Sequence, residues 1–205
     1  MYTFFDVGAN HGSDSLGVAR TRSDAVVYAF EPTPYLVKHL QNESRNLTNY
    51  HVIPKAVSNF TGQTTFYISG NADWGCSSIC EFNNNLERTW PGRTDFRVTD
   101  QVTVDVIQLA DFIKEHGIKT IDYLHVDAQG QDLEVLMGLC EYINIVKRGQ
   151  IEMPTSHTSK LYKNQRYIKD DAIRFLEEHG FTINGVYSND AQGNEVNIQF
   201  TKQLQ

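Results

Sequence analysis

The sequence has few cysteines, no long run of basic residues and no long apolar segment. Its 205 residues include three cysteines and five prolines. No apolar stretch approaches the ~20 residues that a membrane-spanning helix needs, and no secretory signal is seen. A small and odd number of cysteines excludes a scaffold built on disulfides and predicts reduced thiols in the cytoplasm. The three are Cys76, Cys80 and Cys140.

The charge balance is acidic. The formal net charge is −7 and no basic run stands out, which disfavours a nucleic-acid partner because such a partner needs a basic face. With 40% hydrophobic and 21% charged residues, the chain is expected to form one domain, 1–205, with a full core. Only Met1 and Tyr2 precede the first predicted strand, which favours a domain taken from a longer protein.

The G-x-G-x-x-G pattern of dinucleotide-binding folds is also absent. Instead, the first predicted strand, from Thr3, runs into a turn that contains Asp6, Gly8, Asn10 and Gly12. Glycine lets a backbone approach a ligand closely, whereas an aspartate in the turn would repel a diphosphate. The turn therefore suits a ligand that carries an amine and a sulfonium, S-adenosylmethionine, better than it suits a dinucleotide.

A carboxylate follows the second predicted strand. The apolar run from Ala25 to Phe30 is typical of a buried parallel strand, and it leads directly into Glu31. An acid about 20 residues beyond a glycine turn can hold the two hydroxyls of a ribose. The two segments together predict a nucleoside pocket at the carboxyl edge of a parallel sheet.

Strands alternate with helices along the rest of the chain. Further strands are predicted at 50–57, 63–68, 121–126 and 143–151, and helices at about 14–20, 34–40, 109–117, 130–137 and 169–179. Residues 181–187 and 196–202 are expected to form a terminal hairpin, and the turn-rich residues 70–100 a long loop. This order predicts an α/β fold, Rossmann-like, with a mostly parallel doubly wound sheet and a C-terminal antiparallel hairpin, as in class I methyltransferases.

Four acids fall at the ends of predicted strands: Asp6, Glu31, Asp127 and Glu152. Ligands bind at the carboxyl ends of the strands in such sheets. Because carboxylates are rarely placed at the edge of a core without a partner, these four predict a ligand-binding rim.

Longer motifs resemble the FkbM family of S-adenosylmethionine-dependent methyltransferases, from about Phe4 to Phe200. The motifs are 6–12 (DVGANHG), 29–32 (AFEP), 56–58 (AVS), 104–109 (VDVIQL) and 125–136 (HVDAQGQDLEVL). Family members commonly O-methylate sugars in glycans and natural products, and many lie beside, or are fused to, glycosyltransferases. The resemblance implies an O-methyltransferase with a sugar or glycan acceptor and with a fused or associated glycosyltransferase as a partner.

The resemblance also implies roles in cofactor binding. Gly8 and Asn10 would line the methionine portion, with His11 and Gly12 in the same turn, and Asp6 would order the turn and attract the amine. A cap on the following helix is the alternative role for Asp6. Later in the chain, one acid would hold the ribose and two apolar residues would flank the adenine. These are Glu31, Ala56 and Val57.

The resemblance fails at two positions. The family often has Lys where His125 stands and Glu where Gln129 stands, so no catalytic role is carried over to these two residues. His125, inside an apolar strand, is expected to be a buried and hydrogen-bonded core residue.

Methyl transfer to a sugar hydroxyl needs a base or a metal ion, because the hydroxyl is a poor nucleophile until its proton leaves. Asp127, which would also border the cofactor, is the first catalytic candidate, and Glu152 lies at a neighbouring strand end. The pair either binds a divalent cation such as Mg²⁺ or hydrogen-bonds substrate or loop amides without metal. His157, on the loop after Glu152, is a candidate general base, with a solvated loop histidine as the alternative.

Three other functions stay open. The acceptor of a methyltransferase of this type could be a lipid, a peptide or a non-sugar small molecule. The altered Gln129 favours a non-catalytic binding module with the same fold. An NAD-dependent oxidoreductase is disfavoured by the missing third glycine and by Asp6.

Overall fold

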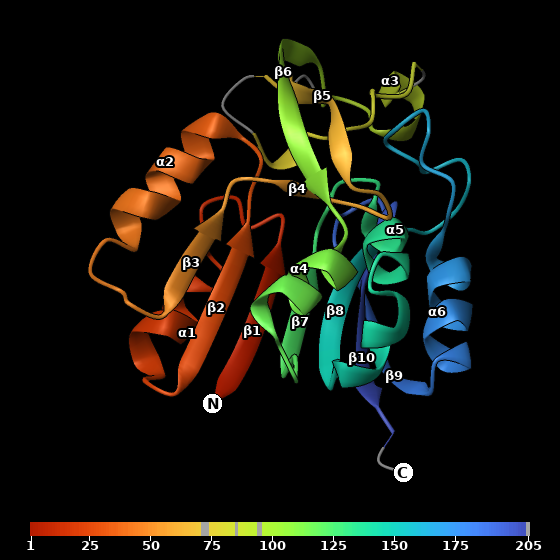
Figure 1. Ribbon diagram of the computed structural model, residues 1–205. Coiled ribbons are helices and arrows are strands. Elements are labelled where there is room, and N and C mark those ends of the chain that lie inside the picture. Colours follow the sequence, from red (N-terminus) through yellow and green to blue (C-terminus); the bar gives the residue numbers. More distant parts are fainter. Residues whose placement is uncertain (71–73, 85, 94–95, 204–205) are drawn as a thin grey trace.

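A seven-stranded sheet forms the centre of the molecule (Figure 1), in the order β3-β2-β1-β7-β8-β10-β9. The computed structural model describes residues 1–70, 74–84, 86–93 and 96–203. β10 runs antiparallel to both of its neighbours, and the remaining pairs of strands are parallel. The predicted α/β class and the terminal hairpin are confirmed. The strands are β1 Tyr2–Val7, β2 Ala25–Phe30, β3 Tyr50–Ile53, β7 Tyr123–Val126, β8 Arg148–Pro154, β9 Phe181–Ser188 and β10 Glu195–Lys202.

Helices cover both faces of this sheet, as a doubly wound fold requires. Successive side chains of a strand point to opposite faces. Phe4 accordingly packs in a cluster with Leu40 of α2, whereas Phe5 packs with Leu109 of α4. The helices are α1 Leu16–Thr21, α2 Pro34–Glu43, α3 Leu86–Thr89, α4 Leu109–His116, α5 Asp132–Met137 and α6 Lys169–Glu178, with 3₁₀ helices η1 Trp74–Cys76 and η2 Cys140–Ile145.

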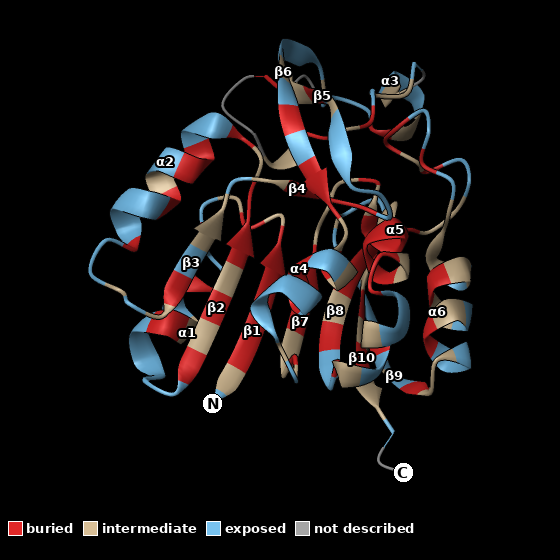
Figure 2. Ribbon diagram, viewed as in Figure 1, coloured by how far each residue is buried: buried red, intermediate tan, exposed pale blue. Residues whose placement is uncertain are grey.

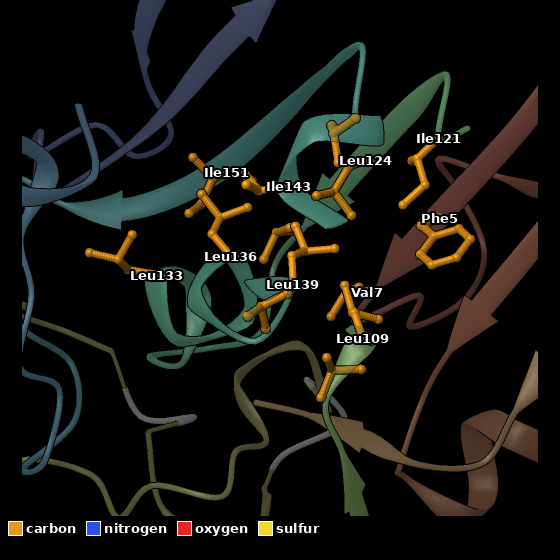
Figure 3. Close-up of a cluster of buried hydrophobic side chains, with 14 of the residues drawn as sticks. Phe5, Val7, Leu109, Ile121, Leu124, Leu133, Leu136, Leu139, Ile143 and Ile151 are labelled. Carbon is orange, nitrogen blue, oxygen red and sulfur yellow. The ribbon is translucent and has the colours of Figure 1, made fainter. Parts of the chain in front are cut away.

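The larger of the two clusters is the main core. Buried positions concentrate on the central strands and on the inner sides of the helices (Figure 2). Figure 3 shows Phe5 and Val7 of β1 in this cluster together with Leu124 of β7 and Leu136 of α5. Burying these side chains holds β1 and β7 in place, and the candidate site is built on the turns that follow these two strands. Within the described ranges, no helix combines the length and apolar character that crossing a membrane requires.

A second, three-stranded sheet lies beyond the carboxyl ends of the main strands (Figure 1). It consists of β4 Ala56–Val57, β6 Val98–Ile107 and β5 Gly62–Ser69. The antiparallel strand predicted at 63–68 is confirmed, but the single strand predicted over 50–57 is wrong, and so is the loop predicted up to residue 100. The chain breaks at Pro54, which has no N–H for a sheet ladder. The first six residues of β6 are exposed or half-buried, so the strand has little apolar periodicity.

The strand predicted over 143–151 is displaced towards the C-terminus. The apolar residues Ile143 and Val146 are buried, but Ile143 belongs to η2, and β8 begins only at Arg148. Apolar runs of this length do not distinguish a strand from a buried helical turn. The shift places Glu152 within β8 rather than directly after it.

Candidate functional site

A narrow, partly open cavity lies where β1, β2 and β7 end. Small-molecule sites occur preferentially at this edge of α/β sheets. The turns after these strands form one wall, and β4 with part of the second sheet forms the other. Six of the residues predicted from the sequence line the cavity: Gly8, Asn10, Glu31, Ala56, Val57 and Asp127.

The turn after β1 needs glycine at its first position. Gly8 has φ +81°, and a Cβ there would lie 1.9 Å from the carbonyl oxygen of Asp127. The N–H of Gly8 donates to the carbonyl of Phe30 at 3.0 Å. The glycine thus lets the ends of β1, β2 and β7 meet, and the cavity forms at this junction.

The glycine turn and Glu31 are joined by a direct hydrogen bond. One Glu31 oxygen accepts the backbone N–H of Asn10 at 2.8 Å, and the other accepts the N–H of Thr33 at 2.7 Å. Burial raises the pKa of Glu31, against the lowering effect of these hydrogen bonds. The side-chain oxygen of Asn10 is buried without any partner in the described protein. Glu31 and Asn10 therefore both offer acceptor oxygens at the cavity, and each Glu31 oxygen keeps a second lone pair.

Three residues of the predicted cofactor turn do not border the cavity. Asp6 is fully buried within β1. Gly12 lies against Leu16 and Leu40, whose side chains a Cβ would strike at 2.6 and 2.9 Å, so packing and not ligand approach requires this glycine. His11 is exposed, and its ring lies 5.1 Å from that of His39. The cofactor roles of these three remain predictions.

Asp6 instead pairs with His125 across the β1–β7 ladder. The Nδ1 of His125 lies 2.9 Å from Asp6 Oδ1. Burial lowers the pKa of His125, but the hydrogen bond and the charge of Asp6 outweigh burial and raise this pKa to about 9. His125 is therefore a buried cation that balances Asp6, and its predicted place as a hydrogen-bonded core residue is confirmed.

Asp127 and Glu152 do come together, with the amide of Gln129 between them. Gln129 Nε2 donates to Asp127 Oδ1 at 2.5 Å and to Glu152 Oε2 at 3.1 Å. The amide is oriented in turn by the hydroxyl of Tyr162, which donates to Gln129 Oε1 at 2.7 Å. The second Glu152 oxygen accepts from the side-chain amide of Asn189. Sequence reasoning noticed Gln129 only as a departure from the family pattern.

Burial raises the pKa of both acids of this pair. For Asp127 the charge of His125 and hydrogen bonds from Gln129 and Glu152 oppose the effect, whereas for Glu152 the negative charge of Asp127 adds to it. Two carboxyls this close favour one proton between them. The opposing effects at Asp127 make it the more acidic member of the pair, and it is the member that borders the cavity.

These side chains do not present an open cation site. The Gln129 amide occupies the position between the two carboxylates that a metal ion would take, and no group of three or more His, Cys, Asp or Glu is placed to hold a metal among the described residues. The cation site predicted at Asp127 and Glu152 therefore stays a prediction.

His157 does not border this cavity. It lies on a separate open groove beside α3, and its role as a general base remains a prediction. The second sheet and the segment that follows β5 bring Phe66, Ser77 and Ile79 to the cavity. The places of Phe66 and Ile79 were not predicted, because the second sheet as a whole was not predicted.

We expect the protein to lose stability as the pH rises towards 9. Burial raises the pKa of Glu195 to about 8, and that of His125 is about 9. Both groups hold a proton more tightly when folded. Their contribution is therefore complete below the unfolded pKa values, about 4.3 and 6.5, and is lost as the pH rises through the folded values. The melting temperature should fall by several degrees between pH 5 and pH 9. Glu195→Gln should flatten the curve, and a melting temperature that rises over this range would contradict the assignment.

The comparisons with known proteins agree with this geometry. The chain is 30% identical over 139 residues to the 2-O-methyltransferase NoeI of Sinorhizobium fredii. The matched region covers 65% of this chain and 55% of the relative. The chain is 28% identical over 141 residues to Methyltransferase 1 of Beauveria bassiana, covering 65% and 57% of the two chains. The chain therefore spans little more than half the length of these relatives.

Solved structures share the fold at low sequence identity. Fibrillarin of Aeropyrum pernix with bound S-adenosyl-L-methionine gives a TM-score of 0.55 at 11% identity, over 98% of this chain and 66% of that one. A putative methyltransferase of Streptococcus mutans in complex with SAH gives 0.54 at 12% identity, over 99% and 89%. These likenesses show the class I methyltransferase fold. The family model described as the methyltransferase FkbM domain matches residues 6–183, nearly the whole chain, and the chain therefore belongs to the FkbM methyltransferase family.

Proposed function

We propose that this chain is an S-adenosylmethionine-dependent O-methyltransferase that acts on a hydroxyl group of a sugar. The observation that carries the proposal is the junction of the glycine turn with Glu31, where a buried carboxylate and the free Asn10 oxygen face one cavity. Membership of the FkbM family supports methyl transfer, and the relative that is a 2-O-methyltransferase supports oxygen as the acceptor atom. The cofactors in the two structural neighbours support the choice of nucleoside.

The lining of the cavity matches the parts of this cofactor. Glu31 is placed to accept hydrogen bonds from the ribose hydroxyls while the backbone amides of Asn10 and Thr33 hold its carboxylate still. Ala56 and Val57 form an apolar wall suited to a base. Asn10 Oδ1 is available to the ammonium group. All three elements act by positioning, which removes entropy from the barrier to reaction.

The chemistry needs one proton acceptor from the chain. When bound, the cofactor supplies a methyl group on a positively charged sulfur, an electrophile that a hydroxyl oxygen attacks in line. The new C–O bond forms as the C–S bond breaks, and the electron pair stays on sulfur. We assign to Asp127 the proton that the hydroxyl loses, because its carboxylate borders the cavity and is the more acidic of the pair. Glu152 and Gln129 keep that carboxylate in place.

Glu31→Gln tests the cofactor site. We expect the affinity for S-adenosylhomocysteine to fall about 10- to 100-fold, because a charge-assisted hydrogen bond contributes roughly 1.5–3 kcal/mol. The amide oxygen still accepts one backbone N–H, so the fold should survive, as the melting temperature will report. Calorimetric titration of the variant and of the exposed control Glu43→Gln measures the effect. Equal affinity in all three proteins would remove Glu31 from the site.

The acceptor is tested by supplying the wild-type protein with methyl-labelled cofactor and a panel of glycans, lipids, peptides and phenols. Label on the sugars supports the proposed function. Label on another class of compound would show that the acceptor is not a sugar, while still supporting methyltransferase activity. Binding of S-adenosylhomocysteine without transfer to any member of the panel favours a non-catalytic binding module.

A further inference from the structure

A second cavity, the polar groove, lies apart from the cofactor cavity and has no assigned role. It is an open groove with about 580 Å³ of space, lined by residues 155–159 and Asn194 on one side and by Asn83, Arg88 and Thr89 on the other. Figure 1 shows α3, which carries Arg88 and Thr89, beside the segment that follows β8. None of these residues borders the cofactor cavity.

The lining of the polar groove is unlike the rest of this acidic protein. The chain has 25 acidic and 18 basic residues, yet among the residues that the structure describes no carboxylate and no large apolar side chain lines the groove. Five of the lining side chains carry hydroxyls and two carry amides, and Arg88 and His157 complete the set. Hydroxyls and amides suit a ligand rich in hydroxyl groups, and the guanidinium suits an oxyanion.

The walls of the groove are fixed to each other by hydrogen bonds. Asn194 Nδ2 donates to the carbonyl of Thr89 at 3.0 Å, which joins the β9–β10 turn to α3. Thr155 Oγ1 donates to the carbonyl of Gly193 at 3.0 Å. Ser159 Oγ accepts the N–H of Ser156 at 2.9 Å and so closes the loop after β8. The groove is therefore preorganised, and a ligand need not order it.

Three side chains in the groove have hydrogen-bond donors that are not used within the protein. Among the described residues, the side chains of Asn83, Arg88 and His157 make no hydrogen bond or ion pair. Arg88 and His157 are exposed. An arginine with no carboxylate in the same groove offers all five of its N–H donors to a ligand.

The groove begins close to the reacting groups. β8 carries Glu152 and leads directly into Thr155, and the β9–β10 turn carries both Asn189, which donates to Glu152, and Asn194 of the groove. A ligand in the groove therefore extends from the side of the site that the acid pair occupies.

We propose that the polar groove binds an acceptor sugar that bears an oxyanion, either a carboxylate or a phosphate, with the anionic group at Arg88. This inference rests on the proposed function and adds the class of sugar to it. The amides and hydroxyls of the groove bind the ring hydroxyls. Arg88 selects the charged sugar over its neutral counterpart.

Titration of the whole protein with matched probes tests the proposal. The probes are glucose, glucuronic acid, glucose 1-phosphate and inorganic phosphate, each followed by calorimetry or NMR at fixed ionic strength. We expect at least one anionic sugar to bind about tenfold or more tightly than glucose, as a charge-assisted contact allows. The two anionic sugars separate a carboxylate site from a phosphate site. Arg88→Gln should abolish the difference, and Arg45→Gln, a change at an exposed arginine outside the groove, should preserve it.

Several outcomes overturn the inference. Equal affinity for glucose and for both anionic sugars would show that the groove does not distinguish charged from neutral sugars. Binding of inorganic phosphate as tight as that of glucose 1-phosphate shows an anion site without a sugar site. An unchanged preference in Arg88→Gln places the contact elsewhere. The affinity for S-adenosylhomocysteine, measured on the same samples, separates the two proposals. If the protein binds S-adenosylhomocysteine but shows none of the expected sugar binding, the groove proposal is rejected and the proposed methyltransferase function is not affected.

Discussion

Replacing Asp127 with asparagine is expected to lower kcat by roughly 10²- to 10⁴-fold, the contribution that a positioned general base makes. The variant keeps the size of the side chain but removes its charge and its ability to take a proton. Asp127 borders the cofactor cavity, whereas burial raises the pKa of the neighbouring Glu152 and disfavours its ionised form. The measurement is the rate of methyl transfer to the best acceptor of the panel at saturating cofactor.

Glu134→Gln is the matched control for this substitution. Glu134 is also a buried acid, but it lies in α5 and does not border the cavity. We expect its kcat to stay within a few-fold of wild type, and the affinity of both variants for S-adenosylhomocysteine to stay close to wild type. If Asp127→Asn turns over at the wild-type rate, the base lies elsewhere.

Gly8→Ala is expected to be the most damaging small substitution in the chain. The new methyl group would meet the carbonyl oxygen of Asp127 at 1.9 Å, in a backbone conformation with φ +81°. Alanine in this conformation costs about 1–2 kcal/mol and forced overpacking roughly 1–3 kcal/mol more. At about 2–4 °C per kcal/mol for a domain of this size, the melting temperature should fall by roughly 5–15 °C. Binding of S-adenosylhomocysteine should be lost with it.

Gly193→Ala separates the two causes. Gly193 has a similar φ of +70°, but a Cβ there has no atom within 4 Å. This control has the conformational cost alone, and its melting temperature should fall by roughly 2–8 °C, less than that of Gly8→Ala. Equal losses in the two variants would mean that the contact with Asp127 does not matter.

Much of the fold was predictable because its signals are local. Ala25–Phe30 is an apolar run that forms β2, Pro34 begins α2, and Gly117 ends α4 at φ +63°. Each of these depends on the conformational preferences of a few adjacent residues. The second sheet was not predictable in this way, because the first six residues of β6, which pair with β5, are exposed or half-buried and have little apolar periodicity.

Part of the site was predictable for the same reason. The ends of parallel strands share one edge, so Gly8, Glu31 and Asp127 had to lie near each other once their strands were assigned. Gly12 also packs against Leu16 and Leu40, and its predicted cofactor role stays a prediction. The prediction placed His157 at the cavity, whereas the loop after β8 turns towards α3 and carries this residue to the polar groove.

The fold class, the edge of the sheet that binds ligand and the family could thus be predicted from the sequence, since turns and periodic apolar positions act over short distances. The partners of the individual side chains were not. Asp6 meets His125 across 119 residues, and Glu152 meets Gln129 across 23. Such contacts depend on the register of neighbouring strands and on the packing of segments far apart in the chain. The tertiary structure alone decides both, and it therefore also decides which acid pairs with His125 and which two acids share the amide of Gln129.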